Sequence, residues 1–252
     1  MSSGAKQLVQ IAKETVIGTV PSPFARQTLA FTDISLNQSV EKTESASITD
    51  NRLQQSSMIT SAEYSGELSA EAQYGAYDDL MAAAAFNAWA TNVLTFGGTT
   101  RQTFSVLLGY TDIANYHTFS GLHVNTFGID IPEAGLIGLT FGFMGTKRTT
   151  AAVAPVGTIT PASSNPRMSN ISVGDLLVDG ASVKGTACIT AFSFNWDNSM
   201  QVRKCLGAGL EVGAILEMSA KGTGSFTMAW STKAAELYEK QFTNGNISLS
   251  IP

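Results

Sequence analysis

The segment Glu63–Gln73 reads EYSGELSAEAQ, and polar residues alternate in it with small or apolar ones. Its odd-numbered positions are Glu, Ser or Gln, and its even-numbered positions are Tyr, Gly, Leu or Ala. Successive side chains of a β-strand point to opposite faces, so this alternation predicts a half-buried strand whose even-numbered residues point inward. The chain is therefore expected to contain a sheet with one polar face.

The same pattern returns 158 residues later, in Lys221–Ser231, which reads KGTGSFTMAWS. Most odd-numbered positions are again polar, and Phe226, Met228 and Trp230 occupy the even-numbered side. Upstream, residues 31–37 align at the same offset with residues 189–195. A helix is predicted after each copy of the strand, over residues 77–90 and over residues 232–243. We interpret these aligned features as a diverged duplication.

Segments of different composition divide the chain around this repeat. A hairpin is predicted over residues 122–143, because apolar residues alternate on both sides of the turn Pro132–Gly135. Residues 147–170 are rich in Thr, Ala, Pro and Ser and contain the best candidate for a boundary. The predicted organisation is an N-terminal arm (1–27), a first unit (28–150), a linker (151–170) and a second, repeat-related unit (171–252).

Composition excludes several classes of function. The net charge is −5, and the 15 basic residues are not clustered, which argues against a protein that grips nucleic acid through its phosphates. Phosphate-binding, nucleophile-elbow and kinase motifs are absent from the sequence. Cys188 and Cys205 have no metal-type spacing, and no carboxylate cluster accompanies His117 and His123, the only histidines. We therefore predict no enzyme activity, no metal and no cofactor.

The acidic row Glu63, Glu67 and Glu71 could suggest a pair of catalytic carboxylates. Residues four apart on one strand are separated by about 13 Å, which is too far for the carboxylates of a glycosidase. An acidic stripe that faces solvent or a lumen is the better interpretation, and a plain solvent face remains open. Lys221 and Ser225 occupy this side of the second copy.

A long connection, residues 38–58, lies between the paired strands of the first copy and has almost no core-forming residues. A segment of this kind within a compact unit is expected to be functional or mobile. The charged residues that mark it are Glu41, Lys42, Glu44, Asp50 and Arg52. The N-terminus lacks an apolar export signal, and no stretch reaches the 18 apolar residues of a membrane span, so we expect no membrane association and no secretion.

Taken in order, several motifs resemble the major tail tube protein of long-tailed, non-contractile phages, and the resemblance spans nearly the whole chain. The motifs are ETVIGTVP (14–21), SGEL (65–68), FSGLHVNTF (119–127), FGFMG (141–145), ITAFSFNWDN (189–198) and LYEKQFTNG (237–245).

The resemblance implies a mainly β fold of two related β-sandwich or split-barrel units, each with one flanking α-helix. It also implies rings whose inner strands close a barrel around a channel, and stacking of the rings through the N-terminal arm and the long loop. The lumen would be acidic and double-stranded DNA would pass through it without specific binding. The implied partners are further copies of the chain and the tail terminator, tape measure and distal tail proteins, in a virion tail assembled in the host cytoplasm.

If such a ring keeps six wall segments and each chain supplies two, three chains complete it with pseudo-sixfold symmetry. The rival is a hexamer in which the second repeat forms an outer sheet. A different function also remains open, that of a β-sandwich module of a phage tail or capsid that binds a receptor or a carbohydrate.

Overall fold

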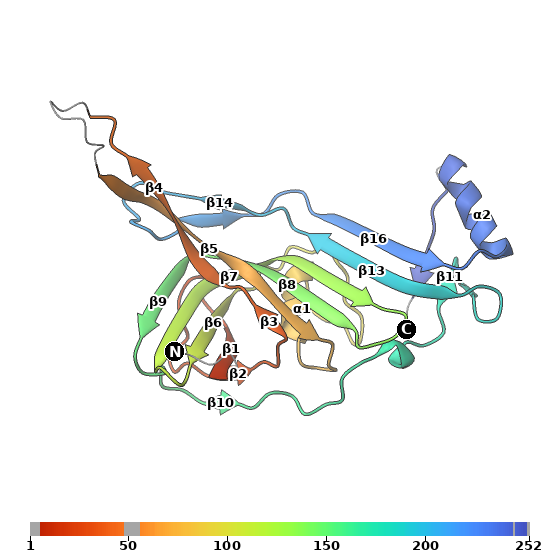
Figure 1. Ribbon diagram of the computed structural model, residues 1–252, viewed down its shortest axis with the longest axis horizontal. Helices are drawn as coiled ribbons and strands as arrows, with labels where there is room; N and C mark the ends of the chain where they lie inside the picture. Colours follow the sequence, from red (N-terminus) through yellow and green to blue (C-terminus); the bar gives the residue numbers. More distant parts are fainter. Residues whose placement is uncertain (1–5, 48–55, 244, 251–252) are drawn as a thin grey trace.

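The protein is mainly β, as the alternating sequence predicted, in a computed structural model that describes residues 6–47, 56–243 and 245–250. Within these residues one sheet of twelve strands curls around the core, and two α-helices accompany it (Figure 1). Five strands form the wall of the curled part. In spatial order they are β1 (Gln7–Lys13), β6 (Phe104–Tyr110), β7 (Asn115–Ile131), β8 (Gly138–Gly145) and β5 (Ser57–Glu71).

The long strand β7 joins two parts of the sheet because it changes partners along its length. Its first half pairs with β6 and with β9 (Lys147–Ala151), and its second half pairs with β8 and with β13 (Ile189–Asp197). The helix α1 (Asp78–Ala85) packs against β7 and buries Leu80 and four alanines. Because alanine side chains are short, the helix lies close to the strands and the volume between them is filled.

The predicted hairpin over residues 122–143 is confirmed by β7 and β8, although β7 begins earlier. The first helix is shorter than the predicted span 77–90. Phe86 adopts a left-handed backbone with φ of 52° and ends α1 there. The second helix, α2 (Thr232–Lys240), continues into a 3-10 turn, Gln241–Thr243, so the two together cover the predicted span 232–243.

The N-terminal residues differ from the extended arm expected over residues 1–27, because β1 lies inside the sheet and pairs with β6. Its sequence hides this position, since Gln10 is buried beside Val9 and Ile11. Gln10 accepts a hydrogen bond of 2.8 Å from the buried guanidinium of Arg26, which satisfies both polar groups. The next strands outward are β2 (Arg26–Thr28) and β10 (Ile159–Thr160), the latter within the predicted linker.

The strand pairing of the first copy recurs in the second copy. Adding 158 to both residue numbers of a pair in the first copy gives the equivalent pair in the second. In the first copy β5 pairs with β3 (Asp33–Ile34) and β4 (Asn37–Glu44), and in the second β16 (Lys221–Met228) pairs with β13. A one-residue shift of register also occurs at the equivalent place in both copies, beyond which β14 (Gln201–Arg203) pairs with β15 (Ala214–Leu216). The equivalent pairs include Ile34–Leu68 and Phe192–Phe226, Asn37–Ser65 and Asn195–Thr223, Ser39–Glu63 and Asp197–Lys221, and Thr43–Met58 and Gln201–Leu216.

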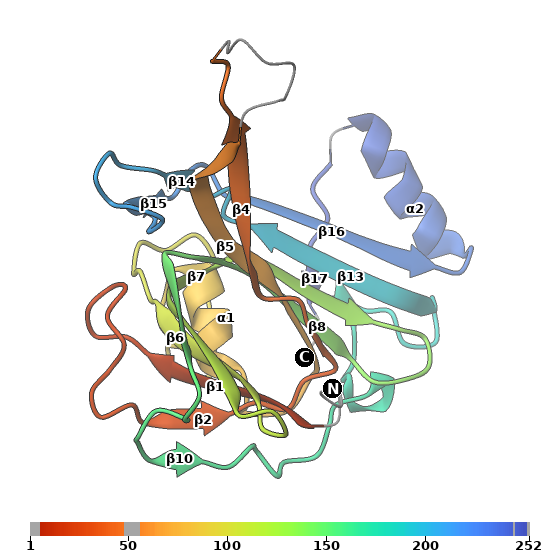
Figure 2. The ribbon, with the colours of Figure 1, turned by 60° about the vertical axis from the view of Figure 1, so that its left-hand side comes forward.

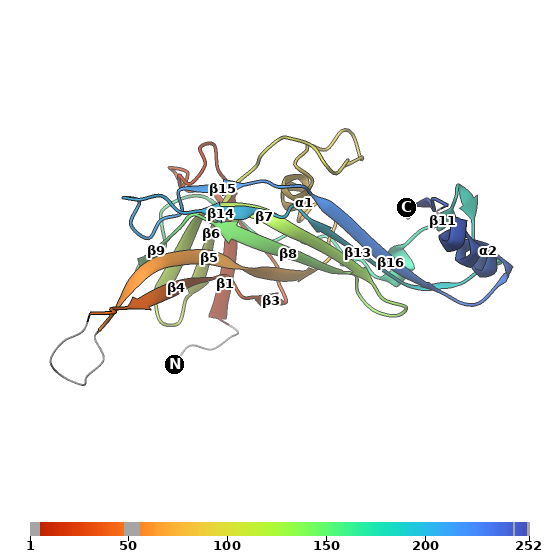
Figure 3. The ribbon, with the colours of Figure 1, turned by 90° about the horizontal axis from the view of Figure 1, so that it is seen from above.

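The β4–β5 and β14–β15 ends of the two hairpins have equivalent strand pairing, but they lie differently relative to the core. The β14–β15 end folds onto the core, where Met200 and Ile215 are buried. The end of β4–β5 extends away from the sheet (Figures 1 and 3). Lys42 and Ser57 stand at the positions of Met200 and Ile215, so the two residues that anchor the β14–β15 end to the core have polar equivalents in the β4–β5 end.

The second copy does not form a separate sheet, because β13 pairs with β7 and continues the sheet of the first unit. Beyond it, a three-stranded sheet and α2 enclose a small satellite core of Val178, Val183 and Leu237. The strands of that sheet are β11 (Leu177–Val178), β12 (Ala181–Ser182) and β17 (Leu249–Ser250).

Candidate functional site

The candidate functional surface is the polar face of six strand layers that lie side by side in the order β3/β4, β5, β8, β7, β13 and β16 (Figure 2). We define the polar face as the surface that carries the odd-numbered residues of β5 and β16. The alternation predicted from the sequence is confirmed on β5, where Glu63, Ser65 and Glu67 are exposed while Tyr64 and Leu68 are buried. This side of the sheet faces away from the core.

Strand pairing brings the two copies into common transverse rows on this face. Glu67 and Lys221 lie in one row, and Glu71 and Ser225 lie in another. The sequence predicted these residues as lumen-facing candidates but gave no reason for the two copies to share a row. The rows read Glu67–Gly142–Thr126–Asp197–Lys221 and Glu71–Gly138–Asp130–Ser193–Ser225.

Two of the three acidic residues of β5 are paired with cations. Glu63 lies 3.2 Å from Nζ of Lys204, and Glu71 contacts the guanidinium of Arg167. Both pairs are partly exposed to solvent, so each contributes about 0–1 kcal/mol to stability. They reduce the charge at the two ends of the row, and Glu67, which lies between Glu63 and Glu71, is exposed to solvent. The acidic stripe is therefore present but partly neutralised.

Further carboxylates of the polar face were not predicted from the sequence, among them Asp130 and Asp197. Each lies in one of the rows described above, and Asp130 is exposed. A sequence signal existed for Asp197, because it aligns at the 158-residue offset with Ser39, which pairs with Glu63. Lys221 pairs with Asp197 across the two strands, so the second copy presents a mixed rather than an acidic surface.

The polar face carries small residues as well as charges. A Cβ atom added at Gly142 would lie 2.1 Å from Oγ1 of Thr126, so the neighbouring threonine fills the space above this glycine. The hydroxyl oxygens of Ser193 and Ser225 lie 2.7 Å apart and form a cross-strand hydrogen bond. Short side chains of this kind make a low, hydrophilic surface rather than a pocket for a ligand.

The six strand layers of the polar face end in two strand edges that pair with no other strand among the described residues. They are the outer edge of β16 and the outer edge of β3 and β4. The unpaired N–H and C=O groups of such an edge form a template for another strand. Neighbouring strands alternate in direction from β4 to β16, so these two edge strands run in opposite directions.

The stacking-loop candidates are only partly within the described residues. Glu41, Lys42 and Glu44 belong to β4, which is paired with β5 rather than being an irregular loop. The carboxylate of Glu41 accepts a hydrogen bond of 2.9 Å from the hydroxyl of Ser61. Asp50 and Arg52 lie outside the described residues.

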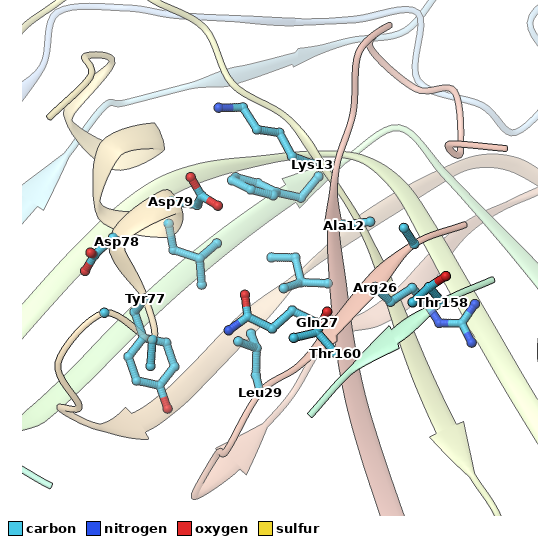
Figure 4. A pocket seen from close by; sticks show the side chains of 16 residues that line it. Ala12, Lys13, Arg26, Gln27, Leu29, Tyr77, Asp78, Asp79, Thr158 and Thr160 are labelled. Atoms are coloured by element: carbon cyan, nitrogen blue, oxygen red, sulfur yellow. The ribbon is translucent and has the colours of Figure 1, made fainter. Parts of the chain in front are cut away.

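A pocket of about 340 Å³ opens between β1, β2 and the start of α1 (Figure 4). Burial and the neighbouring carboxylate of Asp79 raise the pKa of Asp78 at its rim. Arg26 lies at the other end, and its guanidinium donates to the backbone oxygens of Phe24 and Pro155, which shows a structural role. The pocket contains no nucleophile with an adjacent base, so it lacks the constellation that hydrolytic catalysis requires.

The buried carboxylate of Glu14 ties the N-terminal segment to the sheet. It accepts hydrogen bonds from the hydroxyls of Thr103 and Ser105 and from the backbone N–H groups of Gly18 and Gly121, at 2.7–2.9 Å. Four donors satisfy a buried carboxylate, and this explains its place in the chain without a catalytic role.

His123 is a second buried polar group near this network. Its Nδ1 lies 3.0 Å from the carbonyl oxygen of Gly121, and its Nε2 has no hydrogen-bond partner. Burial lowers the pKa of His123 below its ordinary value of 6.5 and Arg101 adds to the effect, while the Gly121 carbonyl, Glu217 and Glu14 oppose it.

This lowered pKa predicts a loss of stability in acid. Below about pH 6.5 the unfolded chain binds a proton at His123 that the folded protein resists, so the free energy of unfolding falls as the pH decreases. We expect the change in thermal midpoint between about pH 7.5 and about pH 5.5 to be smaller in His123→Gln than in the wild-type protein. The pKa of His117 is also lowered, by burial and by Arg148, but this histidine is less buried, so His117→Gln should reduce the pH dependence less than His123→Gln does. Equal slopes in all three proteins would contradict this assignment.

Other chemistry is not supported by the described part of the chain. It contains no cluster of three or more His, Cys, Asp or Glu side chains that could hold a metal ion. Cys188 and Cys205 are both free thiols at exposed positions. None of the helices in the described ranges has the length and apolar character needed to cross a membrane.

Comparison with known proteins identifies the class to which this fold and surface belong. A sequence profile described as phage tail tube protein matches residues 4–252, and the chain belongs to that family. It is therefore a structural component of a phage tail, as the sequence motifs predicted. No curated protein sequence matches the chain. Among solved structures, it is similar to the tube-terminating cap of the anti-feeding prophage, with 12% identity, coverage of 60% of this chain and 91% of that chain, and a TM-score of 0.36.

Proposed function

We propose that this tail tube protein forms rings by joining the outer edge of β16 in one chain to the β3–β4 edge of the next, and that the rings stack into a tube through which DNA passes. The observation that carries the proposal is the pair of open edges at the two ends of the six antiparallel strand layers that form the polar face. A closed ring satisfies the backbone groups of both edges, which no open assembly does.

The register of the duplicated hairpins supports three chains per ring. In each chain the β13–β16 hairpin repeats the pairing of β3–β4 with β5 and lies on the same sheet. Three chains then supply six equivalent hairpins, spaced by four strand layers within a chain and by two across the proposed joint, so the pseudo-sixfold symmetry is one of hairpin number rather than of equal spacing. In the rival arrangement six chains build the ring, and β13–β16 leaves the edge of β7 to make room for the neighbouring chain.

The polar face suits the wall of a channel for DNA. Its carboxylates include those of Asp33, Glu63, Glu67, Glu71, Asp130 and Asp197, and the cations nearest to them include Lys204, Arg167 and Lys221. A surface with a small negative balance and short side chains repels phosphates weakly and offers no site where they could bind.

A charge reversal on this face tests its position in the tube. Glu67→Lys combined with Asp130→Lys should leave folding intact, because both side chains are exposed, yet lower infectivity by about tenfold or more through attraction of phosphates. The variant is introduced into the phage and measured by plaque titre against particle number. Glu133→Lys with Asp79→Lys is the matched control, since it makes the same charge change at exposed positions away from the polar face. Equal infectivity of the two variants would contradict the assignment of the polar face to the lumen.

Assembly itself is tested with the purified wild-type protein at high concentration. Negative-stain images should show rings or tubes, with no requirement for another tail protein. A protein that stays monomeric at every concentration and ionic strength tried would contradict ring formation by the open edges. The tail terminator, tape measure and distal tail proteins remain the proposed partners at the ends and in the bore of the tube.

A further inference from the structure

An exposed row of aromatic side chains runs along α2 and the turn before it. Trp230 is 77% exposed, Tyr238 52% and Phe242 66%. Neighbouring rings meet edge to face, with centroids 6.2 Å apart for Trp230 and Tyr238 and 5.4 Å apart for Tyr238 and Phe242. Exposed apolar side chains gathered in this way are typical of surfaces that another protein covers.

The helix α1 of the first copy is the equivalent of α2, and its surroundings show how a helix at this position is covered by neighbouring strands. α1 follows β5 as α2 follows β16, yet α1 is enclosed and packs against β7, whereas only Leu237 of α2 is buried. The strands β8 and β7 lie beyond the edge of β5 that faces away from β3. The equivalent edge of β16 is the open one, because β16 corresponds to β5 in the register of the duplication.

The position of α2 agrees with this comparison. In two views α2 lies on the side of β16 that faces away from β13, next to the open edge (Figures 1 and 2). A strand added to that edge would therefore run beside the aromatic row. The incoming β3–β4 edge carries its own apolar groups, namely Val40, which is 44% exposed, and the half-buried Phe31 and Ile34.

We propose that the row Trp230, Tyr238 and Phe242 is a contact surface for a second copy of this chain, whose β3–β4 edge covers it when the ring closes. This inference rests on the ring proposed above and adds to it a side-chain contact that strengthens strand pairing. Backbone pairing alone does not select a partner, whereas an aromatic row at one edge and apolar residues at the other favour one orientation of the two chains.

A pair of variants tests the contact. Tyr238→Glu with Phe242→Ser should fold as the wild-type protein does, with an unchanged circular dichroism spectrum, because both side chains are exposed and Leu237 stays in place. The assembled fraction, measured by sedimentation, should fall by about tenfold or more. The matched variant Tyr238→Phe with Phe242→Leu keeps the apolar surface and should assemble normally. Normal rings from the Glu/Ser variant would overturn the proposal.

Oxidative footprinting of the wild-type protein tests the same contact without any substitution, and so applies even if the Glu/Ser variant misfolds. Oxidative footprinting should show that Trp230 and Tyr238 are modified several-fold more slowly in rings than in free subunits, and unchanged rates would overturn the contact. Failure of the ring proposal has a different signature. In that case the wild-type protein itself shows no assembly, whereas failure of the aromatic contact leaves wild-type rings intact and the footprint unchanged.

Discussion

Replacing Gly66 with alanine should lower the free energy of unfolding by about 2–4 kcal/mol. Gly66 adopts a φ of +157° on β5, where the chain between β3 and β4 crosses closely above it. A Cβ atom there would lie 2.4 Å from Cα of Leu36 and 2.6 Å from its backbone nitrogen. Backbone atoms cannot move aside as a side chain can, so the crossing segment would have to lift away from β5.

The duplication supplies the control for this substitution. Gly224 is the equivalent residue on β16, and a Cβ atom there would lie 3.4 Å from the carbonyl oxygen of Ser193, which is close to ordinary contact. Gly224→Ala should therefore change stability by less than about 1 kcal/mol. Chemical denaturation of both variants measures the difference, and equal losses in the two would show that close approach at Gly66 is not the reason for its glycine.

Shortening the β4–β5 arm should abolish stacking of rings while ring formation persists. Residues 45–56 are replaced by Asn-Gly, a two-residue turn that joins the last pair of the arm, Glu44 and Ser57, without removing any pair below it. Electron microscopy should then show single discs in place of tubes, because the arm extends away from the sheet and buries none of its own core (Figure 3). Tubes of normal length from this variant would contradict a role of the arm in stacking.

The equivalent change in the second copy should act on folding instead. Replacing residues 204–213 by Asn-Gly removes Val212, which is buried, and the contact of Glu211 with Lys147. We expect a loss of about 1–3 kcal/mol in the free energy of unfolding. Shortening the first hairpin is thus expected to affect stacking, whereas shortening the second is expected to affect stability, although the strand pairing of the two hairpins is equivalent. A second-copy variant as stable as the wild-type protein would contradict this expectation.

The sequence predicted the parts of the fold that depend on local alternation. The half-buried strand at Glu63–Gln73, the hairpin after it and the helix near residue 232 are all present, because their patterns repeat over many residues. The repeat offset of 158 residues, found in the sequence, also recurs pair by pair in the strand pairing, although the pairing register itself was not predicted. The burial of β1 was missed because it depends on the pairing of Gln10 with Arg26, which are 16 residues apart in sequence.

The candidate surface was predictable only in part for a similar reason. Alternation along β5 placed Glu63, Glu67 and Glu71 on one side, but their neighbours across the sheet depend on which strands pair. Asp130 and Asp197 join the polar face through that pairing, and Lys204 and Arg167 reach the ends of the acidic row from distant segments. The extended arm and the aromatic row of α2 became distinguishable from their copies only when burial was known.

The most direct test of ring assembly is an image reconstruction of the assembled protein by cryo-electron microscopy. We expect three chains per ring, with β16 of each chain paired to the β3–β4 edge of the next and the polar face lining the bore. Six chains per ring, with the β13–β16 hairpin away from the bore and β7 paired to a neighbouring chain, would contradict it.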